Sequence, residues 1–361
     1  MDKYVLLNPG PVNVSERVRQ ALLKADMCHR EEEYFQVQDQ IRRKLLTAFS
    51  LDPEYYTTSL ISGSGTSALE MTVASTLSEG KKILVINNGV YGDRIAKIAD
   101  IYHFGKVEIV SDWGKLPDLN AVEQALKDNP DVEVVALVHH ETTTGLINPV
   151  NAVGSLAKRY GKIFLVDSIS GLGGEDFDFK ESQADFVICT ANKCIQGFPG
   201  MAFTIFKKKE LSRLSRIPSR SLYLNLYSWH QSQEKHGTPF TPAVQIAYAF
   251  EEALDELIEE TVEKRIQRYH NVSKLLRAKF QDLGLSLYLS GVPLSNTITA
   301  LHLPEGKSYE SLHKRFKEKG FIIYAGQGNL QTSVFRIANM GEITESDLVR
   351  LNKVLEEVFK S

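Results

Sequence analysis

The sequence contains few cysteines and no long apolar run. Only three of its 361 residues are cysteine (Cys28, Cys189 and Cys194), and they form neither a paired framework nor a metal-ligand spacing. No apolar run approaches the roughly 20 residues that a membrane helix needs. The N-terminus also lacks the charged-then-apolar layout of a signal peptide. We therefore expect a protein of the reducing cytoplasm.

A strong charge of either sign is missing as well. The 42 lysines and arginines nearly balance the 45 aspartates and glutamates, which gives a net charge of −3. This balance gives no reason to expect nucleic acid or a membrane surface as a partner. Hydrophobic residues (43%) and charged residues (24%) are ordinary for a globular protein. The chain is long enough for one large and one smaller domain, each with its own core.

Short apolar runs alternate with helical patterns over the first two thirds of the chain. This order predicts a parallel, doubly wound α/β sheet. A further strand at residues 203–206 could run antiparallel. The predicted strands lie at residues 59–61, 83–86, 107–110, 132–138, 163–166 and 186–189, and the predicted helices at 67–77, 119–126 and 153–160, with another beginning at 91–94.

The last third of the chain predicts a smaller unit. Helical periodicity over residues 241–283 predicts a long connecting helix. We predict a large domain over residues 1–250 and a small C-terminal α/β domain over residues 251–361, with packing of the N-terminal segment on the small domain as an open option. The small domain would contain strands at residues 297–303, 322–325 and 335–339 and helices at 309–319 and 346–359.

An acid and a lysine follow two neighbouring apolar strands. Asp167 ends the run at 163–166, and Lys193 comes shortly after the run at 186–189. The carboxyl ends of parallel strands form one edge, where ligands bind. A desolvated lysine can attack an aldehyde and form a Schiff base, and an aspartate can keep a pyridine nitrogen protonated. An ordinary loop lysine and a turn aspartate are the alternatives. We predict that the pair holds one pyridoxal phosphate (PLP) molecule.

A glycine-rich turn precedes the helix at residues 67–77. Gly63-Ser64-Gly65-Thr66 would present free backbone N–H groups and the positive end of a helix dipole to a phosphate. The same residues, with Ala68, also fit a dinucleotide fingerprint. The strand at 83–86 ends without an acid that could hold a ribose hydroxyl, which argues against NAD.

Three further places hold candidate functional residues. Tyr91 could stack on a flat cofactor ring, or it could be plain packing. The run His139-His140-Glu141 could suggest a metal site, but neighbouring strand residues point to opposite faces and no third ligand has a fitting spacing. Arg336 lies in an apolar strand, where it would bind a carboxylate or phosphonate or form a structural ion pair.

With these residues in hand, the chain resembles the class V (fold type I) aminotransferases along nearly its whole length. Within that class it is most similar to the 2-aminoethylphosphonate–pyruvate aminotransferase subgroup. The matching segments are LLNPGPV (6–12), GSGT (63–66), NNGVYGDR (87–94), HHETTTG (139–145), VDSISGLGG (166–174), ANKCIQGFPG (191–200), FTP (240–242) and FRIANMG (335–341).

This resemblance implies a role for each matching residue. It also implies a mostly parallel seven-stranded sheet in the large domain, and a homodimer with active sites at its interface. In the implied site, Lys193 binds PLP covalently and Asp167 pairs with the pyridine nitrogen. The phosphate is bound by Ser64, Gly65 and Thr66 together with Thr241 of the neighbouring subunit. Tyr91 stacks on the ring, Thr142 lies near its phenolic oxygen, and Arg336 binds the anionic end of the substrate.

The resemblance also implies the reaction. We expect an amino group to move from 2-aminoethylphosphonate to pyruvate, in either direction. The alternatives are a PLP-dependent lyase acting on a hydroxylated aminophosphonate, and an alanine– or serine–glyoxylate type of transaminase. Two segments depart from the family pattern. Cys28-His29-Arg30-Glu31 replaces a Cys-Thr-Trp-Asp-like stretch that borders the substrate in this fold, and Gly171 replaces a residue that is often serine.

Overall fold

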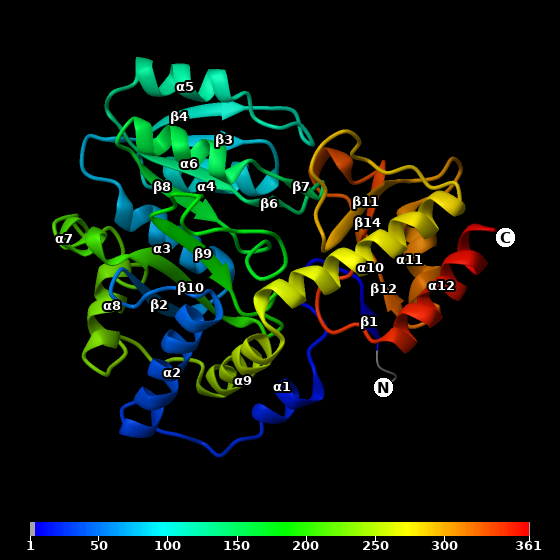
Figure 1. Ribbon diagram of the computed structural model, residues 1–361, viewed down its shortest axis with the longest axis horizontal. Coiled ribbons are helices and arrows are strands. Elements are labelled where there is room, and N and C mark those ends of the chain that lie inside the picture. Colours follow the sequence, from blue (N-terminus) through cyan, green and yellow to red (C-terminus); the bar gives the residue numbers. More distant parts are fainter. Residues whose placement is uncertain (1–3, 361) are drawn as a thin grey trace.

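A seven-stranded sheet forms the centre of the larger part of the molecule in the computed structural model, which describes residues 4–360 (Figure 1). Strand β10 runs antiparallel to both of its neighbours, and the other pairs are parallel. The predicted fold class is therefore confirmed. The order across the sheet is β2 (Tyr56–Gly63), β10 (Gly200–Lys207), β9 (Phe186–Thr190), β8 (Ile163–Asp167), β5 (Val132–Val138), β3 (Lys82–Asn87) and β4 (Gly105–Val110).

Helices cover both faces of this sheet, and successive strand residues alternate between two cores. On β5, Val135 and Leu137 face one core, whereas Val134 and Ala136 face the other. Each fully buried aliphatic side chain stabilises the fold by about 1.5–3 kcal/mol. The first core includes α2 (Glu32–Ala48), α5 (Leu119–Asp128), α6 (Val150–Arg159) and α9 (Val244–Glu260), with α1 (Glu16–Ala21) beside it; the second includes α3 (Gly65–Thr76), α4 (Val90–Ile101), α7 (Leu211–Leu214) and α8 (Leu226–Glu234).

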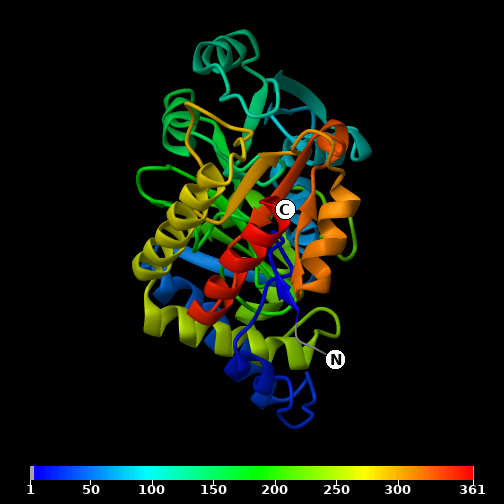
Figure 2. The same cartoon turned by 90° about the vertical axis from the view of Figure 1, so that its right-hand side faces the viewer.

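The C-terminal third builds a separate antiparallel sheet with its own core (Figures 1 and 2). Figure 2 shows α12 in front of this sheet, close to the N-terminal strand. Strand β1 (Val5–Leu6) pairs in parallel with β12 (Phe321–Ile322), so the N-terminal segment packs on this third. The division of the chain at residue 250 stays a prediction. The sheet order is β11 (Ile298–His302), β14 (Val334–Ala338) and β13 (Tyr324–Ala325), covered by α10 (Val262–Asp282), α11 (Tyr309–Glu318) and α12 (Glu345–Phe359).

The single long helix predicted over residues 241–283 is wrong, because the chain forms two helices there. At Thr261 the backbone φ is 70°, in the left-handed region that ends α9, and its side chain accepts a hydrogen bond from the backbone N–H of Lys264 at 3.4 Å to begin α10. Leu257 of α9 joins the large core, whereas Phe280 of α10 joins the small one. The apolar spacing continues across the break, because each helix has an apolar face of its own.

Other elements also differ from the sequence-based expectation. The strand predicted at residues 322–325 is two short strands, because β12 pairs with β1 while β13 pairs with β14. The sequence predicts no element between residues 207 and 240, where α7 and α8 lie. Among residues 4–360, none of the helices combines the length and the apolar composition that a membrane crossing needs. The remaining short elements are β6 (His140–Glu141), β7 (Leu146–Ile147) and the 3-10 turns Lys208–Glu210 and Gly328–Leu330.

Candidate active site

Loops that follow the carboxyl ends of the parallel strands meet at one edge of the large sheet. Asp167 is the last residue of β8, and Lys193 follows β9 by three positions. Ser64 directly follows β2, Tyr91 lies in the first turn of α4 after β3, and Thr142 directly follows the short strand β6 after β5, so all three lie at the same edge. The parallel arrangement of these strands therefore positions most of the predicted site residues.

A cavity of about 470 Å³ opens at this edge. Of the predicted residues, Ser64, Gly65, Thr66, Tyr91 and Lys193 line it directly. Residues to which the sequence assigns no role also line the cavity. One of them is Arg94, and its position one helical turn after Tyr91 is a sequence signal that places it on the same helix face as that tyrosine. The other lining residues are Gly63, Ile169, Thr190, Asn192, Pro199 and Gly200.

Lys193 is largely buried, and burial lowers the pKa of its amine to about 8. A substantial neutral fraction therefore exists near pH 8, which a nucleophilic amine requires. In this structure Nζ donates a hydrogen bond to the backbone oxygen of Pro9. Gly10 packs against the lysine at a φ of 110°, and a Cβ at this position would lie 2.6 Å from Nζ. The N-terminal turn thus leaves room for the lysine only because residue 10 is glycine.

The turn that follows Lys193 is held by α10. Nη1 of Arg265 donates to the backbone oxygens of Cys194 at 3.2 Å and Ile195 at 3.3 Å. Gln196 has a φ of 67°, which is unusual for a residue with a side chain, and its Nε2 donates to the Tyr269 hydroxyl at 2.7 Å. These contacts fix the backbone on which the lysine is mounted.

Asp167 has one satisfied and one unsatisfied carboxylate oxygen. Oδ1 accepts a hydrogen bond from the backbone N–H of Ile169 at 3.0 Å, whereas buried Oδ2 has no partner in the described chain. Burial raises the pKa of this carboxyl to about 6. An unpaired buried acceptor is costly, and a protonated ring nitrogen would supply the missing donor and charge. The unpaired Oδ2 of Asp167 therefore fits the protonated ring nitrogen of PLP.

Thr142 supplies a second unpaired group at the same edge. Its buried Oγ1 has no hydrogen-bond partner among residues 4–360, while its backbone oxygen accepts from Arg336. A free hydroxyl suits the predicted contact with the phenolic oxygen of PLP, and this role stays a prediction.

The N-terminus of α3 forms the expected anion cradle. Ser64 is the N-cap residue in extended backbone conformation, and its side chain makes no capping hydrogen bond. Gly65 lies against Ile169, and an added Cβ would come within 3.0 Å of that side chain. Free N–H groups and the dipole of this twelve-residue helix favour a phosphate.

Glu141 fixes the position of Tyr91. Its Oε2 accepts from the backbone N–H of Tyr91 at 3.1 Å, and its Oε1 accepts from the Thr143 hydroxyl at 2.5 Å. The carboxylate fills the space beside Gly89, where a Cβ would collide with it. Burial raises the pKa of Glu141 to about 7.

The two adjacent histidines have separate partners. Nδ1 of His139 lies 2.9 Å from Ser168 Oγ, and Nδ1 of His140 donates to the backbone oxygen of Ser170 at 3.0 Å. Burial lowers the pKa of His139 to about 4 and that of His140 to about 3, so both are neutral. The His139 ring also explains the departure at Gly171, because a side chain there would collide with Nδ1 of that ring.

Thr241 and the segment Cys28–Glu31 lie away from the cavity of their own chain. Thr241 is exposed, and it does not line the cavity. The segment Cys28–Glu31, the other departure from the family pattern, is a largely exposed loop before α2. Arg30 in this loop is exposed, so on its own chain it is a surface charge.

Arg336 is fully buried on β14, facing the large sheet edge. Its Nε and Nη2 donate to the backbone oxygen of Ala325 at 2.9 and 2.7 Å. Its Nη1 donates to the backbone oxygen of Thr142 at 2.7 Å and to Oε1 of Gln327 at 3.1 Å. All of these acceptors are neutral. Within the described chain the guanidinium is therefore a buried cation without a hydrogen-bonded counter-ion, which points to an anionic ligand.

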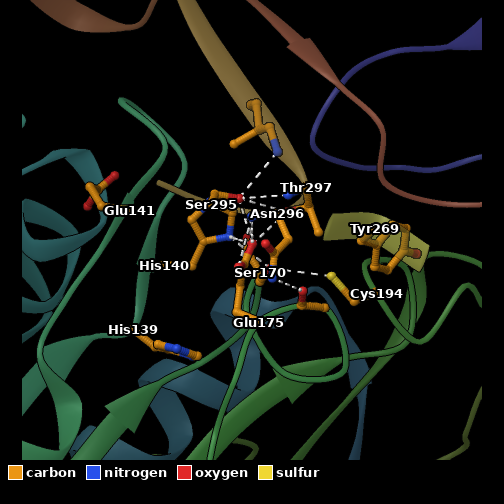
Figure 3. Close-up of polar contacts among 12 residues, drawn as sticks. His139, His140, Glu141, Ser170, Glu175, Cys194, Tyr269, Ser295, Asn296 and Thr297 are labelled. Atoms are coloured by element: carbon orange, nitrogen blue, oxygen red, sulfur yellow. Dashed lines mark hydrogen bonds and ion pairs between the residues drawn. The ribbon is translucent and has the colours of Figure 1, made fainter. Parts of the chain in front are cut away.

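A buried carboxylate joins the loop after β8 to the segment that leads into β11 (Figure 3). Glu175 lies in the loop after β8 and accepts from Ser295 Oγ at 2.6 Å, from the backbone N–H of Asn296 at 2.9 Å and from Thr297 Oγ1 at 3.2 Å. These three residues lead into β11 of the small sheet. The contacts hold the loop that carries Asp167 against the C-terminal third.

The loops that carry Asp167 and Lys193 also touch each other at Ser170 (Figure 3). The Ser170 backbone oxygen accepts from His140 Nδ1 and lies 3.5 Å from the thiol sulfur of Cys194. Nε2 of His140 is then unprotonated, and it is buried without a partner among the described residues.

Glu175 gives a test of this polar cluster that depends on pH. Burial raises the pKa of Glu175 from 4.5 to about 7, although the hydrogen bonds from Ser295 and Asn296 oppose this shift. Nδ1 of His140 lies 3.8 Å from Oε1 of Glu175. Its stabilising contribution is complete below pH 4.5 and is lost as the pH rises through 7. We expect the unfolding free energy of Glu175→Gln, relative to the unsubstituted protein, to increase between about pH 5 and about pH 8. Urea denaturation across this range would measure it, and a constant difference would contradict the assignment.

The chain is similar to known proteins along nearly its whole length. A family profile described as aminotransferase class V matches residues 18–348. A 2-aminoethylphosphonate–pyruvate transaminase of Vibrio vulnificus is 39% identical over 99% of this chain and 98% of its own length. A protein of the same description from Bacillus cytotoxicus is 38% identical over 98% and 97%. The solved alanine–glyoxylate aminotransferase of a Nostoc species superposes with a TM-score of 0.92 at 26% identity, covering 99% of this chain and 96% of that one.

Proposed function

Because this chain belongs to the class V aminotransferases, we propose that it transfers the amino group of 2-aminoethylphosphonate to pyruvate, giving phosphonoacetaldehyde and alanine, in either direction. It is a PLP-dependent enzyme, which sets aside the dinucleotide alternative raised by Gly63, Gly65 and Ala68. The identity of about 39% along almost the whole chain supports the choice of substrates.

The observation that carries this proposal is the buried guanidinium of Arg336. Phosphonate and carboxylate groups both accept paired hydrogen bonds from a planar guanidinium. The amino donor and the oxoacid each have one anionic end, and they occupy the site in turn. One buried cation can therefore orient both substrates, after exchanging its present contacts with Ala325, Thr142 and Gln327.

Each remaining residue has a defined task in the proposed reaction. Bound PLP supplies an electron-withdrawing ring that stabilises negative charge on the carbon that bears the amine. Asp167 would keep the ring nitrogen protonated, Tyr91 and Thr142 would orient the ring, and Ser64 to Thr66 would hold the phosphate. Nζ of Lys193 would take a proton from the amine-bearing carbon as general base and would deliver it to the cofactor as general acid.

Two further features belong to the proposal. We place Thr241 in the active site of a neighbouring subunit of a homodimer, as the resemblance to the class V aminotransferases implies, and its exposure on its own chain leaves it accessible to such a subunit. The exposed free thiol of Cys28 suits a reducing compartment, and we place the enzyme in the cytoplasm.

A substrate panel tests the proposed reaction, and Arg336→Ala tests its anion site. The unsubstituted enzyme should form alanine from pyruvate fastest with 2-aminoethylphosphonate. In Arg336→Ala we expect KM for both substrates to rise by about 10- to 100-fold, because charge-assisted hydrogen bonds worth ~1.5–3 kcal/mol are lost. Arg336→Lys keeps the charge but not the planar fork, so its KM values should lie between the two.

The same panel separates the alternatives. Serine and alanine with glyoxylate test the glyoxylate type of transaminase, and ammonia release from a hydroxylated aminophosphonate without an oxoacid tests the lyase. If either reaction exceeds aminoethylphosphonate transamination in kcat/KM, the proposed substrate is wrong. If Arg336→Ala leaves both KM values unchanged, the anion site lies elsewhere.

A further inference from the structure

Arg94 reaches the cavity from α4, one turn after Tyr91. Its Nη1 donates a hydrogen bond to the Thr66 hydroxyl at 3.1 Å. Its guanidinium carbon lies 4.7 Å from the centroid of the Tyr91 ring. All three side chains line the same cavity, so Arg94 lies behind the tyrosine and beside the anion cradle.

These contacts leave the charge of Arg94 without an ion-pair partner in the described chain. A hydroxyl and an aromatic ring hold its side chain, and neither carries a negative charge. The acid next to it in sequence, Asp93, accepts instead from Asn87 Nδ2 at 2.7 Å. The positive charge of Arg94 opposes the rise in the pKa of Asp167, but the two side chains form no hydrogen bond. A half-buried arginine held in this way at a cavity wall is prepared for an anion.

The cradle beside Arg94 needs more positive charge than a helix supplies. A bound phosphate monoester carries about two negative charges near pH 7. The N-terminus of α3 offers the equivalent of about half a positive charge. The missing charge is close by, because Thr66 belongs to the first turn of α3 and already binds Nη1 of Arg94.

We propose that Arg94 is a phosphate-binding residue of the cofactor site. It would add a full positive charge to the cradle formed by Ser64, Gly65 and Thr66, and its guanidinium supports the Tyr91 ring through their contact. The inference rests on PLP being the cofactor, and it does not depend on which amine the enzyme uses.

The phosphonate of the substrate is the other anion that could use this cation. Both anions are tetrahedral phosphorus oxyanions, so affinity for phosphate alone would not separate them. The position of Arg94 favours the cofactor, because its hydrogen bond goes to the first turn of α3. Arg336, from the small sheet, takes the substrate in the proposed function.

Binding of two cofactor forms to the apoenzyme tests the proposal. PLP and pyridoxal differ by the phosphate group, so a residue that binds phosphate affects only PLP. In Arg94→Gln we expect Kd for PLP to rise by about 10- to 100-fold, as for a lost charge-assisted hydrogen bond. Kd for pyridoxal should stay within about twofold. Absorbance titration of protein stripped of its cofactor measures both constants.

Three variants make the comparison decisive. Lys97→Gln removes a positive charge from the exposed face of the same helix and should bind both forms like the unsubstituted protein. Arg94→Lys should recover most of the PLP affinity. Arg94→Met keeps an apolar stem over Tyr91 without charge, and it replaces the glutamine variant if that variant does not fold.

Two results would overturn the proposal. Equal losses for PLP and pyridoxal would mean that Arg94 only supports the Tyr91 ring. An unchanged Kd for PLP, with or without a raised KM for 2-aminoethylphosphonate, would remove Arg94 from the phosphate site. In the second case the proposed transamination could still hold, because the substrate panel tests it separately.

Discussion

Lys193→Ala should lose essentially all turnover while it still binds PLP. The variant lacks the amine that holds the cofactor covalently, so the visible absorbance of the covalent link should disappear. It also lacks the group that moves the proton at the substrate carbon, and general acid–base catalysis alone is worth about 10²–10⁴-fold. We expect kcat to fall by at least about 10⁴-fold, because the covalent and proton-transfer roles are lost together. Steady-state kinetics and absorbance spectra would measure the two effects.

Two controls separate this loss from misfolding. Asp167 and the α3 cradle remain in Lys193→Ala, so the apoprotein should still take up PLP reversibly. An added small primary amine should restore part of the turnover, because it can replace the missing base. Retention of full activity would contradict the assignment of Lys193. A variant that folds and binds PLP but gains nothing from added amine would count against the role of Lys193 in proton transfer.

The large sheet and its ligand-binding edge follow from local features of the sequence. Apolar runs such as residues 163–166 are buried on both faces, and polar residues such as Asp167 mark where they end. Parallel strands place such ends together, so the sequence alone assigns Asp167 and Lys193 to one edge. The seven-stranded, mostly parallel sheet is confirmed.

Features that depend on long-range partners could not be predicted in the same way. The break at Thr261 requires knowing that α9 and α10 pack on different cores. The contacts of Glu175 join a loop after β8 to residues more than 100 positions later in the chain. No local sequence pattern predicts these contacts. Arg94 lies in the matching segment NNGVYGDR without a predicted role, because its contact with Thr66 appears only when α3 and α4 lie side by side.

Asp167→Asn should uncouple catalysis from stability. Asparagine can still accept from the backbone N–H of Ile169, so the loop should keep its conformation. It cannot supply the negative charge that keeps a ring nitrogen protonated. Losing one such electrostatic group costs about 10²–10³-fold in kcat, and we expect an effect of about that size with a smaller change in KM.

When PLP is absent, the stability of the same variant should stay equal or rise, in contrast to the fall in its kcat. In the folded apoprotein, burial raises the pKa of Asp167 from 3.8 to about 6. The stabilising effect of this carboxyl is complete below pH 3.8 and is lost as the pH rises through 6. At about pH 7.5 the Asp167→Asn apoprotein should therefore be at least as stable to urea as the unsubstituted apoprotein. Activity within about tenfold of the unsubstituted enzyme, or a large loss of apoprotein stability, would show that Asp167 is a structural acid and not the partner of the cofactor ring.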